Sequence, residues 1–257
     1  DLELQHTTMT GNRVGDAMQA PGLIVQHNFA HSSASLSYSV ITDHTGRAAV
    51  VAQQAGDTVT LDHTLFHNNS SNYGSQAGLV PGTINSSNEF EGSPGFRNPR
   101  EDGFDYHLSA QSIARDRAVG STISDDIDLQ QRPHAGIADL GADEYAPLSL
   151  TALPRVGGDI LVRWYTDPTL FPDVVAYKIS VSCGQGGACL PSLLASASVT
   201  VDSSMNSYVL EDLTVGTTYD IVVQALDGDG QVIAESGEAQ ARPADSFIFV
   251  PMVMTSR

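Results

Sequence analysis

Carboxylates are the most numerous titratable groups in this chain, which has 30 Asp and Glu against 12 Lys and Arg and 8 His. The segment ISDDIDLQQR, residues 123–132, concentrates three of them at Asp125, Asp126 and Asp128. Carboxylate oxygens are the ligands that Ca²⁺ prefers in proteins. We therefore take these three residues as candidates for calcium ligands, and we predict no other metal or cofactor in the chain.

The other acidic residues near the start of the chain do not suggest a catalytic pair. Asp43, Asp57 and Asp62 are spread over predicted strand ends and turns, and we expect them to be solvated turn acids. The spacing of His63 and His67 could suggest a metal pair, but four residues of a strand span about 13 Å. Because that distance is too long for shared coordination, we expect stacked or surface histidines. We predict no catalytic residue.

The two cysteines favour a disulfide. Cys183 and Cys189 lie in SCGQGGACL, a short glycine-rich loop between two predicted strands that can bring its ends together. A zinc or redox pair is the alternative, but the chain has no CxxC motif and every histidine precedes residue 135. Since disulfides form in oxidising compartments, the pairing goes with a secreted protein.

The charge balance restricts the partners. A net charge of −18, with Lys178 as the single lysine, disfavours nucleic acid and anionic membrane surfaces because their phosphates would be repelled. No apolar run approaches the ~20 residues that a membrane-spanning helix needs. We expect a soluble monomer, secreted or at the cell surface, whose partners are extracellular polysaccharides or cell-surface components.

The elements that would position these side chains repeat along the first part of the chain. A shift of 25 residues aligns LSYSVITDH, residues 36–44, with LDHTLFHNN, residues 61–69, and a weaker copy runs through residues 82–92. Repeats of this length built of short strands are typical of solenoids, because each unit buries its apolar face only against stacked neighbours. The predicted vertical neighbours are Leu36 with Leu61 and Val40 with Leu65.

Alternation along the second copy predicts which side chains share a face. With a period of two, Leu61, His63 and Leu65 fall on one face of the strand and Phe66 falls on the other. Asparagines suit left-handed corners and amide ladders in such coils. Those that we expect to serve in this way are Asn68, Asn69, Asn85 and Asn88.

The next segment, residues 93–145, has an alternating FDYHL, an acidic centre, an Arg-Pro step and a terminal DLGADEY. In this order it resembles the C-terminal end of secreted bacterial right-handed parallel β-helix proteins of the pectin-lyase type, with an ending of the choice-of-anchor kind. The chain departs from that ending at QSIARD, residues 111–116, which lacks the Pro and Gly of the relatives' SPAID-x-G. The residues that match are Asp116, Arg132, Asp139, Gly141 and Glu144.

The resemblance implies an all-β fold with the terminal coils of a right-handed parallel β-helix over residues 1–92 and a cap over residues 93–146. The cap would fold over the last coil and cover strand edges that could otherwise pair with another chain. In related caps the acidic step belongs to the structural ending, which is the alternative to calcium binding. Expected against the coil interior are Phe104, Tyr106 and Leu108, with Asp105 and His107 at the rim.

After residue 146 the chain changes to short strand-like runs separated by Gly, Asp and Pro turns, which indicates a β-sandwich. The step LTVGTTY, residues 213–219, matches the L-x-x-G-x-x-Y pattern that leads into a late strand, with its tyrosine as a tyrosine-corner residue. Residues 147–243 thus resemble a fibronectin type III domain, a fold that by itself leaves function open. The core expected for this domain includes Trp164, Tyr177, Leu213 and Tyr219.

The two ends of the chain carry further expectations. Residues 1–20 lack the features of a signal peptide, and the few repeats favour a longer solenoid whose earlier coils precede residue 1. The tail, residues 244–257, contains FIFVPMVM. A sorting or processing signal and a final edge strand on the sandwich are equally compatible with this run.

Two functions remain open. The first is a non-catalytic, structural or adhesive surface protein with a rigid β-helix stalk and a spacer or carbohydrate-binding sandwich. The second is the end cap and accessory domain of a polysaccharide lyase or glycoside hydrolase whose catalytic coils lie upstream. The lack of a convergent acid and base cluster in the sequence favours the first, and the known activities of the fold favour the second.

Overall fold

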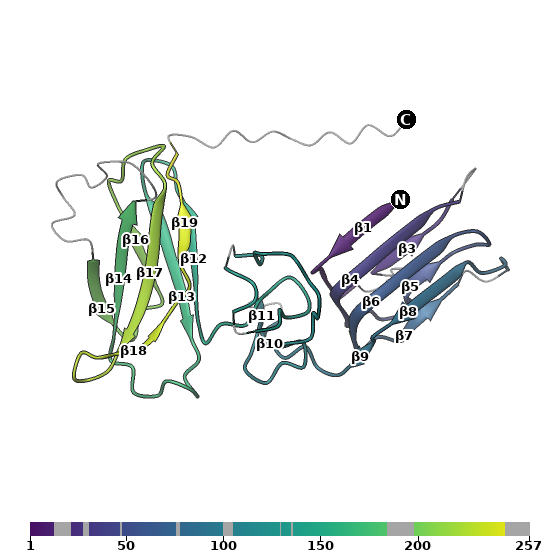
Figure 1. The fold of residues 1–257 in the computed structure, drawn as a ribbon, viewed down its shortest axis with the longest axis horizontal. Coiled ribbons are helices and arrows are strands. Elements are labelled where there is room, and N and C mark those ends of the chain that lie inside the picture. The colour runs from purple at the N-terminus through teal and green to yellow at the C-terminus, as the bar shows by residue number, and fades with distance from the viewer. Residues whose placement is uncertain are drawn as a thin grey trace. The chain divides into compact units, whose positions relative to one another are not determined.

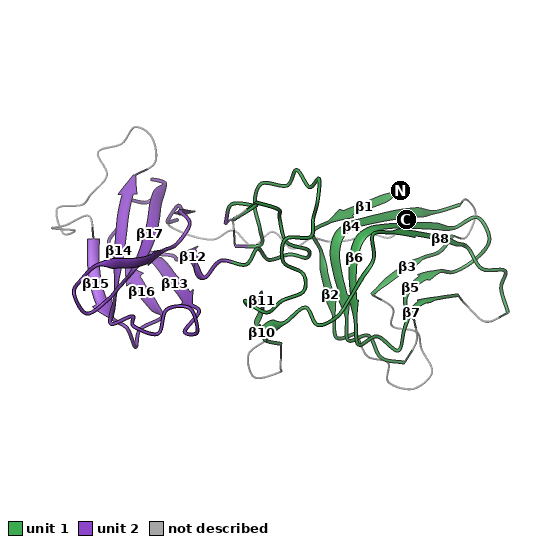
Figure 2. Ribbon diagram, turned by 60° about the horizontal axis from the view of Figure 1, so that its bottom comes forward, with its two compact units in different colours: residues 1–127, 131–145 green, residues 128–130, 146–257 purple. Residues whose placement is uncertain are grey.

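In the computed structural model, all elements of the described residues are strands. The strands belong to two compact units, one of residues 1–127 with 131–145 and one of residues 128–130 with 146–257 (Figure 2). Over the described ranges, no helix has the length and apolar character needed to cross a membrane. The described residues are 1–12, 22–27, 31–46, 48–75, 78–99, 105–128, 130–134, 136–183 and 198–244.

The first unit begins with a sheet in which all strands run parallel. Strand β4 pairs with β1 and β2 on one side and with β6 on the other, and β6 pairs with β8 and β9. Figure 1 shows β1, β4, β6 and β8 side by side in this order. The members are β1 (Leu2–Gln5), β2 (Thr8–Thr10), β4 (Ser33–Thr42), β6 (Thr58–His67), β8 (Thr83–Ser87) and β9 (Phe90–Glu91).

A second parallel sheet closes the same core. It consists of β3 (Leu23–Val25), β5 (Ala48–Ala52) and β7 (Ser71–Gly74). Buried residues of both sheets form one apolar cluster, in which Leu36 and Leu61 of the first sheet join Val50 of the second. Two parallel sheets around a shared interior are therefore the architecture of the described residues between 2 and 91.

The strands pair in the register that the 25-residue repeat predicts. Leu36 lies beside Leu61 and Val40 beside Leu65, and Val59 beside Ile84 extends the pattern into the third copy. Like residues stack on like residues because every copy places its apolar positions at the same height of the coil.

The face alternation predicted for residues 61–66 is wrong. Leu61 and Phe66 share the interior cluster, whereas Leu65 belongs to a separate apolar cluster. The reason is His63, whose φ of 48° lies in the left-handed region, so the chain turns there and the order of inward and outward side chains shifts. Tyr38, with a φ of 53°, turns the neighbouring strand at the equivalent position.

Two of the predicted corner asparagines also have positive φ, namely Asn68 at 49° and Asn88 at 50°.

The cap segment, residues 93–145, packs on the side of the first sheet, and this corrects the expectation that it covers the edge of the last coil. The N–H of Gly141 donates to the carbonyl of Tyr38 at 2.8 Å, and the N–H of Ala142 donates to Oγ1 of Thr8 at 3.0 Å. Within the described ranges, β8 pairs only with β6, and its residues are mostly exposed. Because the corners at Tyr38 and His63 turn apolar side chains outward, the sheet's outer face needs a cover.

That cover is a second apolar cluster. Val40 and Leu65 are fully buried beneath it. The cap residues that contribute are Leu108, Ala114, Ala118, Ala138, Leu140 and Tyr145.

The FDYHL run forms one strand of a small antiparallel pair, β10 (Phe96–Asn98) with β11 (Asp105–Leu108). Leu108 is buried in the outer cluster and not in the coil interior, which corrects that expectation. Tyr106 is half-buried against Phe96, and Asp105 pairs with His107 at 2.5 Å in a half-exposed position. Phe104 lies outside the described residues.

The second unit consists of two antiparallel sheets. One contains β12 (Leu148–Pro154), β13 (Ile160–Thr166) and β16 (Ser207–Leu210). The other contains β14 (Ala176–Cys183), β15 (Ser198–Asp202), β17 (Tyr219–Leu226), β18 (Val232–Glu235) and β19 (Ala239–Ala241). Their buried side chains share one core, which includes Trp164, Tyr177, Leu213 and Tyr219.

Candidate functional site

A buried cation organises the cap segment. The side chain of Arg132 has no exposed surface and lies 3.4 Å from Oε2 of Glu144. Its guanidinium donates to the carbonyls of Asp139 at 3.0 Å and Gly141 at 2.9 Å. Burial lowers the pKa of Arg132, and the negative charge of Glu144 acts in the opposite direction. Arg132 thus holds the loop that ends in DLGADEY.

The matching carboxylates bind backbone N–H groups. Glu144 accepts from the N–H groups of His134 and Asp139, both at 2.8 Å. Asp139 accepts from the N–H groups of Asp116 and Tyr145, both at 2.7 Å. The segment has little regular structure, and these side chains replace the partners that a sheet would give its backbone.

Two further carboxylates, one from the acidic centre and one from DLGADEY, belong to the same network. Asp126 accepts from the N–H of Glu144 at 3.2 Å, and Asp143 accepts from the N–H of Leu108 at 2.6 Å. Burial raises the pKa of Asp143 to about 7 and that of Asp139 to about 6. Asp143 therefore titrates near neutral pH, and Asp139 titrates somewhat below it.

His6 connects this network to the first coil. Its Nδ1 accepts a hydrogen bond from Arg132 at 3.0 Å, so its Nε2 carries the proton and donates to Oγ of Ser121 at 2.6 Å. Burial, and then the nearby Arg132, lower the pKa of His6 to about 4. The imidazole stays neutral at physiological pH and links coil and cap.

A column of rings continues from His6 along the outer face of the coils. His6 stacks on Tyr38 and Tyr38 packs on His63, each with ring centroids 5.3 Å apart, and Phe90 follows at 6.4 Å. Arg117 of the cap lies 4.8 Å above the ring of Phe90. His63 therefore lies between two aromatic rings in tilted contacts.

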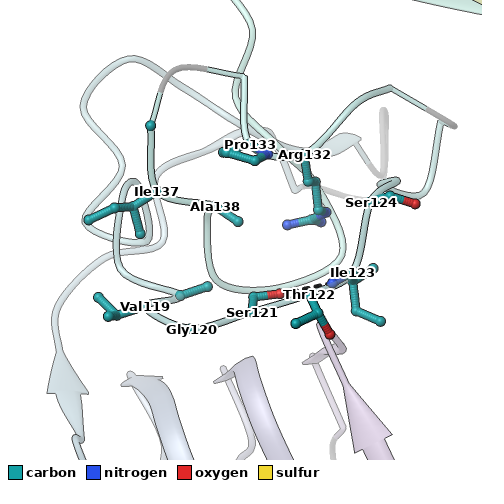
Figure 3. Close-up of a pocket in the computed structure, with 12 residues that line it drawn as sticks. Val119, Gly120, Ser121, Thr122, Ile123, Ser124, Arg132, Pro133, Ile137 and Ala138 are labelled. Atoms are coloured by element: carbon teal, nitrogen blue, oxygen red, sulfur yellow. Dashed lines mark hydrogen bonds between the residues drawn. The ribbon is translucent and has the colours of Figure 1, made fainter.

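Beside Arg132 the cap contains a pocket of about 310 Å³ (Figure 3). Two loops of the cap form its walls, and the side chain of Arg132 extends between them (Figure 3). The N–H of Ile123 donates to Oγ of Ser121 at 3.3 Å within the wall. The lining residues are Ala118, Val119, Gly120, Ser121, Thr122, Ile123, Ser124, Arg132, Pro133, Gly136, Ile137 and Ala138.

The calcium candidates have different surroundings. Asp125 is exposed and accepts from the hydroxyl of Ser124 at 2.6 Å, whereas Asp126 is buried and bound to the backbone of Glu144. Asp128 belongs to the second unit. Asp126 is thus part of the cap's hydrogen bonding, and calcium binding by the three residues stays a prediction.

Asp57 is not a solvated turn acid, as the sequence suggested, but fully buried. It lies 2.5 Å from Nδ1 of His27 and accepts from the backbone N–H groups of Ser32 and Gln54. Burial acts to raise the pKa of Asp57, but the hydrogen bonds from His27 and the backbone outweigh it and lower that pKa. No local pattern could have found this pair, because 30 residues separate its two members.

Cys183 ends β14, and Cys189 lies outside the described residues, so the disulfide between them stays a prediction. The tail from residue 245 onward also lies outside the described residues.

No family model matches this chain, and no curated protein matches it. Similar solved structures include a myokine, 18% identical over 37% of this chain and 92% of that one, with a TM-score of 0.29. The FN1–FN3 domains of chicken CNTN1 are 21% identical over 40% of this chain and 34% of theirs, with a TM-score of 0.30. An fn3 domain of human contactin 1 is 22% identical over 41% of this chain and 80% of that one, with a TM-score of 0.31. Fibronectin type III domains are thus among the similar structures, at scores that say nothing about function.

Proposed function

We propose that residues 1–92 are the last coils of a right-handed parallel β-helix and that residues 147–243 are a fibronectin type III sandwich. Two parallel sheets with a 25-residue register around one core support the first assignment. Two antiparallel sheets support the second, together with the hydroxyl of Tyr219, which accepts from the N–H of Thr214 at 2.9 Å as a tyrosine corner does.

The function that the site favours is non-catalytic. In this proposal the chain belongs to a secreted or cell-surface β-helix protein and has a structural, adhesive or carbohydrate-binding role. One observation carries this proposal: the cap's inner carboxylates accept hydrogen bonds from backbone N–H groups. Asp139, Asp143 and Glu144 are exposed to only 3%, 5% and 3%. A general acid or base must reach its substrate, and these groups are committed to holding the cap.

The second candidate is the end cap and accessory domain of a polysaccharide lyase or glycoside hydrolase. Strands β1 and β2 pair only with β4 among the described residues, so their other edge is available to a further coil. Catalytic groups of the whole protein would then lie on that coil.

Binding and turnover assays on the purified chain test both candidates. We expect retention on one or more immobilised glycans and no release of reducing ends or unsaturated products from neutral or acidic polysaccharides. Turnover that disappears when an acid within residues 1–146 is replaced would establish the enzyme instead. Failure to bind any glycan would remove the carbohydrate-binding part of the proposal and leave a structural role.

A further inference from the structure

The rim of the cap pocket exposes aliphatic side chains. Val119, Ile123 and Ile137 line the same hollow and are exposed to 57%, 40% and 41%. Scattered exposed aliphatic residues are ordinary, but several that line one concave site indicate a surface that a ligand covers. Val119 and Ile137 lie together at one end of the hollow and Ile123 lies at the other (Figure 3), so the methyl groups of Val119 and Ile137 are available to one apolar part of a ligand.

The remaining polar lining is neutral. Ser121 accepts hydrogen bonds from His6 and Ile123, so its hydroxyl is left to donate, whereas the hydroxyl of Ser124 donates to Asp125 and is left to accept. Thr122 brings a further hydroxyl to the lining. Arg132 is the one charged residue among those that line the pocket, and its side chain has no exposed surface because Glu144 and backbone carbonyls surround it. A ligand in the pocket thus meets methyl and hydroxyl groups without a charge that would select an anion.

The two walls are tied together before any ligand binds. The N–H of Ala118 donates to the carbonyl of Ala138 at 2.8 Å, and the N–H of Arg132 donates to the carbonyl of Ser124 at 2.7 Å. These bonds join the walls at two places. A preformed site loses little conformational entropy on binding, which favours recognition of a small ligand.

We propose that this pocket binds a neutral, methyl-bearing sugar unit of the 6-deoxyhexose class. Its volume of about 310 Å³ is at the lower end for ligand sites and suits one monosaccharide. A 6-deoxyhexose presents a methyl group at one edge for the aliphatic rim and hydroxyl groups at the other for the serine and threonine wall. The inference rests on the proposed carbohydrate binding and specifies its site and sugar class.

The test compares two sugars that differ only at C6. Methyl α-L-rhamnopyranoside has a methyl group there, and methyl α-L-mannopyranoside has a hydroxymethyl group. Titration calorimetry on the full chain should give an affinity for the rhamnoside about tenfold higher, the effect that one small apolar group has in a fitted pocket. Methyl α-D-galacturonoside, an anionic probe, should bind more weakly than the rhamnoside.

Three variants locate the binding site. Val119→Ser and Ile137→Ser should each weaken rhamnoside binding at least fivefold, because each removes methyl groups from the rim. Ile127→Ser is the matched control, since Ile127 is 68% exposed in the same segment but does not line the pocket. Its affinity should equal that of the parent chain. Unchanged circular dichroism and melting temperature show that each variant is folded.

The outcomes separate this inference from the function on which it rests. Equal affinity for the two glycosides, preference for the uronoside, or rhamnoside binding that survives both rim substitutions would overturn the inference. If a glycan panel then still shows binding of other sugars, the proposed carbohydrate binding stands without this pocket. If no sugar binds at all, both are wrong.

Discussion

The charge of Arg132 is buried, and this environment would not stabilise it without an ion-pair partner and hydrogen-bond acceptors. The guanidinium has exchanged water for Glu144 and two backbone carbonyls, and the attraction of a buried ion pair roughly balances the cost of removing it from water. Replacement of one partner lowers the stability by more than the intact pair contributes, because the other charge then stays buried without its counterion. The residue is therefore required for the cap to stay closed.

Substitution Arg132→Met should lower the free energy of unfolding of the first unit by about 3–5 kcal/mol. Amide hydrogen exchange of residues 93–145 measures this loss. Trp164 is the only tryptophan and lies in the second unit, so its fluorescence follows the unfolding of that unit. This transition is the internal control and should be the same as in the parent chain. Unchanged exchange in the cap segment would show that Arg132 does not hold it.

Asp143 makes the stability of the cap depend on pH. Burial raises the pKa of Asp143 to about 7, so the folded state holds this proton more tightly than the unfolded state does. The stabilisation from that proton is complete below the unfolded pKa near 4 and is lost as the pH rises through about 7. Near-neutral and alkaline solutions thus ionise a carboxylate in surroundings that disfavour its charge.

Substitution Asp143→Asn should remove this dependence while the side-chain oxygen still accepts from the N–H of Leu108. We expect the variant to exceed the parent in unfolding free energy by about 2–4 kcal/mol at pH 8. The difference should vanish below pH 4. Denaturant unfolding at several pH values measures the two unfolding free energies. His6 is present in both proteins, so its contribution to the pH dependence cancels in the difference between them. A variant that is less stable at every pH would contradict the assigned pKa.

For individual residues, the sequence predicted which side chains belong to the recognisable motif of the cap segment but not the distant residues that they contact. Arg132, Asp139 and Glu144 were found because they lie close together in a motif. His6 was not, since 126 residues separate it from the guanidinium that it contacts. Asp57 was misplaced for the same reason, because its burial beside His27 depends on how the chain returns and not on its neighbours in the sequence.

At the scale of elements, one glycine determines how closely the cap approaches β4. Gly141 has a φ of 90°, and a Cβ atom there would lie 2.8 Å from Oγ1 of Thr8 and 3.0 Å from Cγ2 of Val40. Its N–H also donates to the carbonyl of Tyr38. Glycine is thus required both by the backbone conformation and by the contact between the two segments.

Substitution Gly141→Ala should destabilise the first unit by about 2–3 kcal/mol, since the left-handed conformation alone costs about 1–2 kcal/mol for alanine. Gly136→Ala is the control, because Gly136 has a φ of 115° but a Cβ atom there would meet nothing within 4 Å. That variant should lose only the conformational part. Equal losses in the two variants, measured by denaturant unfolding, would show that the contact with β4 contributes nothing.

Strand positions and register followed from the sequence, but the place of the cap did not. The 25-residue spacing of the sequence repeats determines which residues of neighbouring strands lie side by side, and this does not depend on how the connecting segments run. The side on which Val40 and Leu65 emerge depends on the φ of Tyr38 and His63. Positive φ is uncommon for Tyr, and although it is more frequent for His, most His residues do not adopt it, so the residue type alone does not predict it. The backbone turns at these two residues therefore place Val40 and Leu65, which were predicted as stacked neighbours, on the face to which the cap binds.

At the scale of the whole molecule, the two units differ in what they need to stay soluble. The sandwich encloses its own core, from Trp164 to Tyr219. The outer apolar face of the coils is buried by residues 93–145. Each apolar side chain of that face contributes about 1.5–3 kcal/mol when it is removed from water, so the coils without their cap would expose a continuous apolar surface.

Deletion of residues 93–145 from the chain should therefore make the coil portion aggregate, while the isolated sandwich, residues 147–243, stays soluble and folded. Val40, Leu65 and Phe90 would be uncovered together, beside strand edges that can pair with other chains. Light scattering during refolding measures aggregation, and Trp164 fluorescence follows the sandwich. A point variant that keeps the full length, Leu140→Ser, should raise scattering in the same direction, because Leu140 is fully buried in the outer cluster. Coils that remain monomeric without the segment would mean that residues 93–145 connect the two units without protecting either.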